Sequence, residues 1–279
     1  MNSPDRSVVS FHRTRDGFLA ARLGQRAFLA LPSKSGGISV ASAHYIDKSP
    51  EEWRPSDFYI VERLLADEAA FRRYVAEIAD HERQLLTLDR RELKTSAVTP
   101  WGTAQISKVY NEGIISHSTA SHGGFHLDEA RNYLVHPAYR NADGWYEEDC
   151  EWSKVAAMFP PLFTDYERKC ADQTLRDCEP DAYEAVNNVV LGPGESHAKD
   201  ARQFRLNHAR DWLVTLAIKS RQRSGFVECV ATLGGDRRGA ERRFLVPEAE
   251  YDPGRHGFVI HPARHEAHEG PSSFVGWTR

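Results

Sequence analysis

Histidine, hydroxyl and carboxylate side chains gather in two short stretches in the middle of the chain. The first runs from Ser116 to His126 and holds three histidines and four hydroxyl side chains in eleven residues, interrupted by Gly123-Gly124. The second, from Tyr146 to Glu151, begins twenty residues later and holds four carboxylates. Such groups bind metals, transfer protons and attack electrophiles. We therefore take the two stretches together as the candidate site.

A divalent metal is the first chemistry that these residues suit, because imidazoles and carboxylates together form ordinary metal sites. His122 and His126 are the candidate nitrogen ligands. Glu147, Glu148 or Asp149 would supply the oxygen ligand, and we select Asp149. Since the intervening glycine pair disfavours a helix, a bent loop would have to bring the two imidazoles together.

Acid–base and nucleophilic chemistry are the alternatives. Crowded carboxylates repel one another, which raises a pKa and suits proton transfer, so Glu147 and Glu148 are candidate catalytic residues with His122. Ser118, Thr119 and Ser121 are possible nucleophiles, because a reactive hydroxyl needs a neighbouring imidazole, and we select Ser121. The structural alternative places the carboxylates in the first turn of a helix that begins near Glu147, where they stabilise its positive end. The candidate substrate-binding residues are Ser118, Thr119, Gly123, Gly124 and Gln105.

A strand over residues 114–121 would position the first stretch, and its hydroxyl-rich sequence indicates that one face lines a polar cleft. We expect Gly123-Gly124 to end this strand and to hold an anion on its backbone N–H groups. At least one of the two glycines should have a positive φ or lie tightly against another backbone segment. We also expect an imidazole nitrogen of His122 to lie within about 5 Å of a carboxylate of the acidic stretch.

Several familiar enzyme classes are disfavoured by the absence of their motifs. The sequence contains neither G-x-S-x-G nor H-E-x-x-H, and neither a P-loop nor G-x-G-x-x-G. This argues against the common serine hydrolases, zinc proteases and nucleotide-binding folds.

The composition is that of a globular protein, with 41% hydrophobic and 27% charged residues among 279. No apolar run approaches the roughly 20 residues that span a bilayer, and the polar N-terminus lacks the apolar segment of a signal peptide. We therefore expect a cytoplasmic protein without a membrane partner. The four cysteines show no C-x-x-C spacing, which favours reduced thiols over a zinc ribbon.

Charge is distributed unevenly along the chain. Residues 141–184 contain 12 acidic and 4 basic residues, whereas residues 199–245 contain 11 basic and 5 acidic ones. The basic segment suits contact with phosphates, in a nucleic acid or a nucleotide. Alternatively, its side chains pair with the acidic segment of the same chain.

The pattern of apolar residues predicts an α+β fold, a mixed sheet with packed helices. A strand hairpin is predicted around Gly24-Gln25, a third strand over 38–44, and an amphipathic helix over 57–88. Asn111-Glu112-Gly113 predicts a second hairpin, Asp128 the N-cap of a helix, and Arg264 the start of a frayed tail. We divide the chain into a β-rich segment (1–48), a helical segment (56–96), a central motif-bearing domain (99–190) and a β-rich segment (195–279).

The motifs Trp101-Gly102-Thr103-Ala104-Gln105, Ser118-Thr119-Ala120-Ser121-His122-Gly123-Gly124 and Tyr146-Glu147-Glu148-Asp149-Cys150 resemble the signature of a bacterial domain family of unknown function. The resemblance covers residues 99–188 and implies an accessory protein of plasmids, phages and other mobile elements. It supplies no catalytic roles.

Two functions follow as hypotheses. The leading one is a metal-assisted hydrolase or transferase that acts on a phosphate-containing or nucleic-acid substrate. The alternative is a non-catalytic module that binds nucleic acid or protein in plasmid or phage maintenance or counter-defence.

Overall fold

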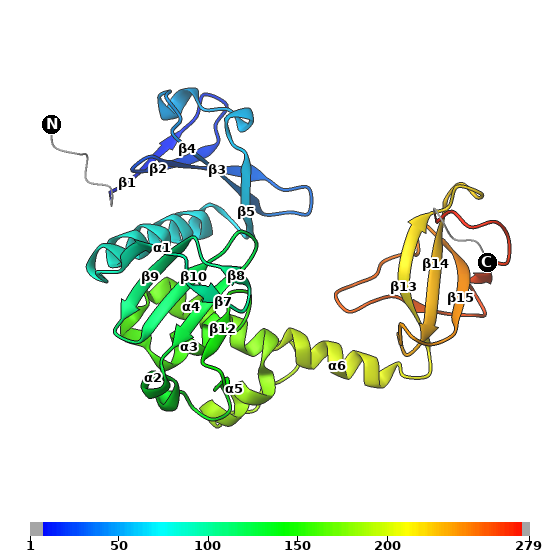
Figure 1. Cartoon of the computed structure of the whole chain (residues 1–279). Coiled ribbons are helices and arrows are strands. Elements are labelled where there is room, and N and C mark those ends of the chain that lie inside the picture. The colour runs from blue at the N-terminus through cyan, green and yellow to red at the C-terminus, as the bar shows by residue number, and fades with distance from the viewer. Residues whose placement is uncertain (1–7, 275–279) are drawn as a thin grey trace. The chain divides into compact units, whose positions relative to one another are not determined.

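The computed structural model describes residues 8–274 of the chain (Figure 1). It confirms the α+β class, with antiparallel sheets and six α-helices among these residues. The chain divides into two compact units, residues 1–175 and residues 176–279.

The first unit begins with a five-stranded antiparallel meander, which confirms the predicted hairpin and third strand. The strands, in both chain and sheet order, are β1 (Val9–Arg13), β2 (Leu19–Leu23), β3 (Arg26–Pro32), β4 (Ile38–His44) and β5 (Ile60–Leu65). One face of the sheet packs against the helix α1 (Glu68–Thr87) through Phe28, Phe71 and Val75. The opposite face is covered by Trp53 from the connection that holds the short helices η1 (Pro50–Glu52) and η2 (Pro55–Asp57).

The predicted helix over 57–88 is correct only from Glu68 onward. Asp67 is the N-cap, and its side chain accepts a hydrogen bond from the Ala70 N–H at 2.7 Å. Residues 60–65 instead pair with β4 and complete the sheet. The apolar residues before Asp67 therefore satisfy strand pairing, which overrides their helical spacing.

The central sheet carries the candidate site and follows the order β12-β11-β10-β9-β6, with all neighbours antiparallel. Its strands are β6 (Arg91–Lys94), β9 (Ile106–Asn111), β10 (Ile114–Ser118), β11 (Gly123–Leu127) and β12 (Trp145–Glu147). The predicted hairpin between β9 and β10 is confirmed, and Gly113 turns it with φ +73°. A separate two-stranded ribbon precedes the sheet, formed by β7 (Val98–Thr99) and β8 (Gly102–Thr103).

Helices cover one face of the central sheet, where Tyr110, Phe125 and Phe163 form an aromatic cluster. Asp128 caps its helix as predicted, accepting from the Arg131 N–H at 2.8 Å. The helical elements of this region are α2 (Glu129–Leu134), α3 (Trp152–Met158), η3 (Pro160–Leu162) and α4 (Asp165–Cys178).

The second unit contains α5 (Pro180–Asn187), α6 (His197–Asn207) and a sheet of order β16-β13-β14-β15-β17. The strands are β13 (Trp212–Lys219), β14 (Phe226–Leu233), β15 (Glu241–Pro247), β16 (Val259–Ile260) and β17 (Glu266–Ala267). These strands lie within the segment from residue 195 onward that the sequence predicts to be β-rich.

The predicted fraying after Arg264 is wrong for residues 265–274. Glu228 is fully buried on β14, and its carboxylate accepts bonds from the Ser272 hydroxyl at 2.8 Å and the Ser273 N–H at 2.7 Å. Arg243 pairs with the same carboxylate at 3.1 Å. A buried acid thus holds the polar tail in place, which its composition did not indicate.

Among residues 8–274, no helix combines the length and the apolar character that a membrane span requires.

Candidate metal centre

The turn between β10 and β11 is closed by Thr119. Its backbone N–H and its hydroxyl both donate to the His122 carbonyl, at 2.8 and 2.7 Å, and the same hydroxyl accepts from the His122 N–H at 3.2 Å. The predicted strand over 114–121 therefore ends at Ser118. Thr119 acts on the backbone here, and the turn leaves the side chain of His122 exposed at the end of the sheet.

The acidic stretch lies beside this turn because β12 pairs with β11. Glu147 is opposite Gly124, and the Glu148 N–H donates to the Gly123 carbonyl at 3.1 Å. One side-chain ligand atom each of His122, Glu147 and Glu148 lie within 4.8 Å of one another. The predicted proximity of His122 to the acidic stretch is confirmed.

The carboxylates do not begin a helix, contrary to the structural alternative. Glu147 ends β12, Glu148 and Asp149 occupy a turn, and α3 starts only at Trp152. The helix-dipole explanation for the acidic stretch is therefore wrong. Pairing with β11 instead places Glu147 at the end of a strand. These carboxylates therefore do not stabilise the positive end of α3.

Gly123 and Gly124 open β11, whereas the sequence placed them at the end of the preceding strand. Their φ angles are not positive, but neither has room for a side chain. A Cβ at Gly123 would lie 2.6 Å from both Glu148 Oε2 and the His117 carbonyl oxygen. A Cβ at Gly124 would collide with the Tyr146 carbonyl oxygen and the Trp101 ring. The prediction of a close approach at these glycines is confirmed.

Glu147 combines burial with an unsatisfied oxygen. Its Oε2 accepts from the Asp149 N–H at 2.7 Å, whereas its Oε1 is buried and has no hydrogen-bond partner among the described residues. Its backbone N–H donates to Glu151 Oε2 at 3.2 Å. Burial opposes ionisation of Glu151, but bonds from Asn141, Glu147 and Lys154 outweigh it and lower the pKa of that carboxyl. An orphaned buried oxygen carries a free-energy cost that a bound cation would remove.

His126, a predicted metal ligand, lies on the open face of the sheet, outside the group formed by His122, Glu147 and Glu148. Its ring packs against Trp145 with 4.4 Å between centroids, because strand register places the two residues opposite each other. His117 lies on the same face, nearly buried, and its Nδ1 is 2.7 Å from the Ser107 hydroxyl. Burial first, and the nearby His126 second, lower the pKa of His117.

The other predicted site residues contribute no ligand atom to the group of His122, Glu147 and Glu148. Asp149 is exposed and contributes its backbone N–H to Glu147. Ser121 is exposed in the turn before His122, and Ser118 accepts at its carbonyl from the Gln105 N–H at 2.8 Å. Gln105 and Ser118 are exposed as well. Of the residues predicted for the site, only His122, Glu147 and Glu148 bring potential metal ligands together.

A cavity of about 600 Å³ adjoins Glu147 on the open face of the sheet. Two tryptophans form part of its wall, Trp101 and Trp145, whose rings meet edge to face with centroids 5.6 Å apart. The sequence did not mark these tryptophans as site residues, because a lone Trp is usually a packing anchor. The one signal in the sequence is the position of Trp145, which lies two residues before Glu147 and so close to the acidic stretch. The lining residues are Pro100, Trp101, Arg140, Asn141, Ala142, Asp143, Trp145, Glu147 and Glu151.

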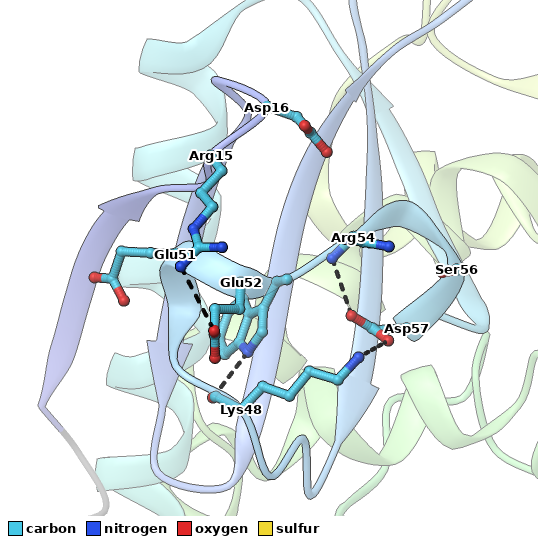
Figure 2. Close-up of a pocket in the computed structure, with 9 residues that line it drawn as sticks. Arg15, Asp16, Lys48, Glu51, Glu52, Arg54, Ser56 and Asp57 are labelled. Atoms are coloured by element: carbon cyan, nitrogen blue, oxygen red, sulfur yellow. Dashed lines mark hydrogen bonds and ion pairs between the residues drawn. The ribbon is translucent and has the colours of Figure 1, made fainter.

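A second cavity, of about 440 Å³, lies in the N-terminal part of the first unit (Figure 2). Charged side chains line it, and several are paired within its own wall: Arg15 with Glu52 at 3.7 Å, and Lys48 with Asp57 at 2.7 Å. None of the residues singled out from the sequence lies in this wall. The candidate site therefore remains at the end of the central sheet.

Part of the basic segment pairs with the acidic segment, as one of the two alternatives predicts. Arg202 forms an ion pair with Asp181 at 2.8 Å, and Lys199 forms one with Glu184. Further along, Arg223 and Arg243 pair with acids of the C-terminal sheet, and Lys219 pairs with Glu248 just after β15. These ion pairs leave a smaller set of arginines as candidates for contact with phosphates.

Residues 94–209 match the family model described as a domain of unknown function, DUF7007. The matched region contains His122, Glu147, Glu148 and both tryptophans of the adjoining cavity. The chain matches no curated protein and no solved structure. The comparisons thus agree with the predicted domain of unknown function and assign it no reaction.

Proposed function

We propose that the central domain is a metal-dependent hydrolase or transferase for a phosphate-containing substrate, with a divalent cation held by His122, Glu147 and Glu148. The observation that carries this proposal is the convergence of these three side chains beside a cavity, with Glu147 in both. Three protein ligands with open positions are typical of catalytic metal sites.

The donor set suits Zn²⁺ or Mn²⁺, since zinc is commonly bound by imidazole and manganese by carboxylates. Metal–ligand bonds of about 2.0–2.2 Å place the ligand atoms of one ion up to roughly 4.3 Å apart. The present spread of up to 4.8 Å therefore requires only small side-chain rotations. The exposed His122 and Glu148 can make such rotations, and an ion bound through Oε1 of Glu147 would give that buried oxygen a partner.

A bound ion would supply Lewis acidity and lower the pKa of a coordinated water. Hydrolysis joins the oxygen of a water to phosphorus as the phosphoester P–O bond breaks. Glu148, which is exposed beside the cavity residue Glu147, would accept the proton of the water, and solvent would protonate the leaving group. Ser121, exposed one residue before His122, is the candidate acceptor in the transferase form of the reaction.

Titration calorimetry on chelator-treated protein tests the metal site directly. Mn²⁺ or Zn²⁺ should bind near one equivalent, and His122→Ala and Glu148→Gln should each weaken binding at least about tenfold. His44→Ala is the matched control, because His44 is also exposed but lies at the end of β4 in the N-terminal sheet. Equal affinity in wild type and in both site variants would refute the metal centre.

Activity is tested with p-nitrophenyl phosphate and bis-p-nitrophenyl phosphate at saturating Mn²⁺. Hydrolysis should require the metal and should be lost in Glu148→Gln. Metal binding without turnover of these or of natural nucleotides would favour the binding module. In that case the same group would recognise a phosphate through the ion, in the mobile-element role that the motifs imply.

A further inference from the structure

The cavity beside Glu147 is shaped by an aromatic corner that the backbone builds in advance. Trp101 lies in the two-residue turn between β7 and β8, where the Thr99 hydroxyl accepts from the Trp101 N–H at 3.2 Å and donates to the Gly102 carbonyl at 2.8 Å. The Trp101 ring reaches Gly124, which has no side chain to exclude it. Trp145 meets it with the ring planes at 85°. Two large flat surfaces are thus fixed at one site before any ligand binds.

Trp145 also has ring contacts with two histidines of the sheet. Its ring contacts the imidazole of His126, with 4.4 Å between centroids, and that of His117, at 5.5 Å. Its backbone N–H donates to Asp143 Oδ1 at 3.1 Å. A rigid aromatic surface loses little conformational entropy when a second ring stacks on it.

Most of the polar side chains in the cavity wall are already engaged within the protein, and Oε1 of Glu147 is the exception. Asn141 Nδ2 donates to the Trp145 carbonyl at 2.7 Å, and Glu151 accepts from Glu147 and from Lys154. Arg140 donates through Nε and Nη2 to the Val135 carbonyl, at 3.0 and 2.7 Å. A sugar needs many free hydrogen-bonding partners around its hydroxyls, whereas a planar heteroaromatic ring needs mainly a face on which to stack.

The charge of the wall also limits what can enter. Asp143, Glu147 and Glu151 are three acids against the single cation Arg140, so a phosphate group is disfavoured inside the cavity. Glu147 nevertheless belongs both to the cavity and to the proposed metal group. A ring in the cavity would therefore place a phosphate attached to it toward His122 and Glu148, where a divalent cation would offset the negative charge.

From these contacts we infer that the cavity binds the base of a nucleotide on Trp101 and Trp145, and that the substrate of the proposed reaction is a nucleotide or a nucleic-acid end. This inference rests on the proposed function for the position of the phosphate, but stacking of the base does not require the metal. The cavity volume of about 600 Å³ accommodates a whole nucleoside. Purines offer the larger stacking surface and should bind more tightly than pyrimidines.

Calorimetry with AMP, UMP and ribose 5-phosphate on the full chain tests the inference, first with EDTA and then with Mn²⁺. Without metal, AMP should bind more tightly than UMP, and ribose 5-phosphate should bind at least about tenfold more weakly than AMP because it lacks the stacking base. Mn²⁺ should strengthen the binding of AMP. A dinucleotide that binds more tightly than AMP would identify a nucleic-acid end as the preferred form.

Trp145→Leu and Trp101→Leu should each weaken AMP binding about tenfold in EDTA. Trp212→Phe is the control, since Trp212 lies on β13 in the second unit. Circular dichroism checks that each variant is folded. If Trp145→Leu unfolds, Trp101→Leu still tests the inference, because Trp101 lies in a turn. Ribose 5-phosphate binding equal to that of AMP, or full affinity in both variants, would overturn the inference. Loss of metal binding alone would overturn the metal centre and leave base stacking standing.

Discussion

Trp101 lies directly over Gly124, and a Cβ at position 124 would be only 2.8 Å from Trp101 Cζ3. This contact joins the turn between β7 and β8 to the strand that follows His122, so a residue that reads as a packing anchor helps to shape the candidate site. The carbonyl of Tyr146 closes the same space from the neighbouring strand. Replacing a hydrogen atom of Gly124 by a methyl group should therefore destabilise the fold and change the shape of the cavity.

Gly124→Ala should destabilise the first unit by about 1–3 kcal/mol, because the methyl group would overpack a space bounded by backbone and by a rigid ring. Urea unfolding followed by circular dichroism measures the change. Gly192→Ala is the matched control, since its Cβ would meet only Glu195 Oε2 at 3.4 Å. An equal loss of stability in Gly124→Ala and in the control would mean that Trp101 and β12 can move to make room for the methyl group, contrary to the described packing.

Substitutions can distinguish two sets of metal ligands. The sequence predicts His122, His126 and Asp149, whereas the structure indicates His122, Glu147 and Glu148. Asp149→Asn and His126→Phe should leave Mn²⁺ affinity unchanged, because Asp149 contributes its backbone N–H and His126 packs on Trp145. Glu147→Gln should lower the affinity, since it removes charge from a residue of the converging group. Calorimetry on the three variants distinguishes the sets. Loss of affinity in Asp149→Asn would restore the ligand set predicted from sequence.

Glu228 should make the second unit acid-sensitive. Burial opposes its ionisation, but bonds from Ser273, Ser272 and Arg243 outweigh burial and lower its pKa. A lowered pKa in the folded state contributes stability above the unfolded pKa of about 4.3, and this stability is lost as pH falls through the folded value. Amide exchange over residues 226–247 between pH 6 and pH 3 should show this loss.

Glu228→Gln should flatten that pH dependence and destabilise the second unit by about 3 kcal/mol at neutral pH, because Arg243 would keep its charge without its partner. Glu266→Gln provides the control, since its pair with Arg223 is exposed and worth roughly 0–1 kcal/mol. An unchanged acid profile in Glu228→Gln would assign the sensitivity to other groups.

If the basic segment binds nucleic acid, contact should come from the arginines for which residues 8–274 show no ion pair: Arg205, Arg210, Arg221, Arg237, Arg238 and Arg242. Within this set, Arg237, Arg238 and Arg242 lie on or beside the β14–β15 hairpin. Their combined change to Ala should weaken binding and lower the salt dependence by about 0.7–0.9 per lost phosphate contact. Arg202→Ala, which removes a residue paired with Asp181, should leave that slope nearly unchanged.

Gel-shift titrations on single- and double-stranded DNA and on RNA measure both quantities. No shift at low salt with micromolar protein would favour the alternative in which the basic segment serves only to pair with acids. The ion pairs of Lys199 and Arg202 with Glu184 and Asp181 already show such pairing at the beginning of the segment.

The sequence by itself determined which side-chain chemistry is present and much of the local structure. Asn111-Glu112-Gly113 specifies a hairpin and Asp128 a helix start, because turn geometry and capping depend on a few neighbouring residues. The proximity of His122 to the acidic stretch also followed from the excess of polar groups in both stretches.

Only the tertiary structure decided which of these residues meet. The register of β11 and β12 places His126 opposite Trp145 and Gly124 opposite Glu147, so His126 lies two residues farther along the strand than the position that meets Glu147 and His122. No short-range pattern encodes that register. The same holds for Trp101 over Gly124 and for the tail held by Glu228, because each joins residues that are distant in sequence and adjacent only after the sheets have formed.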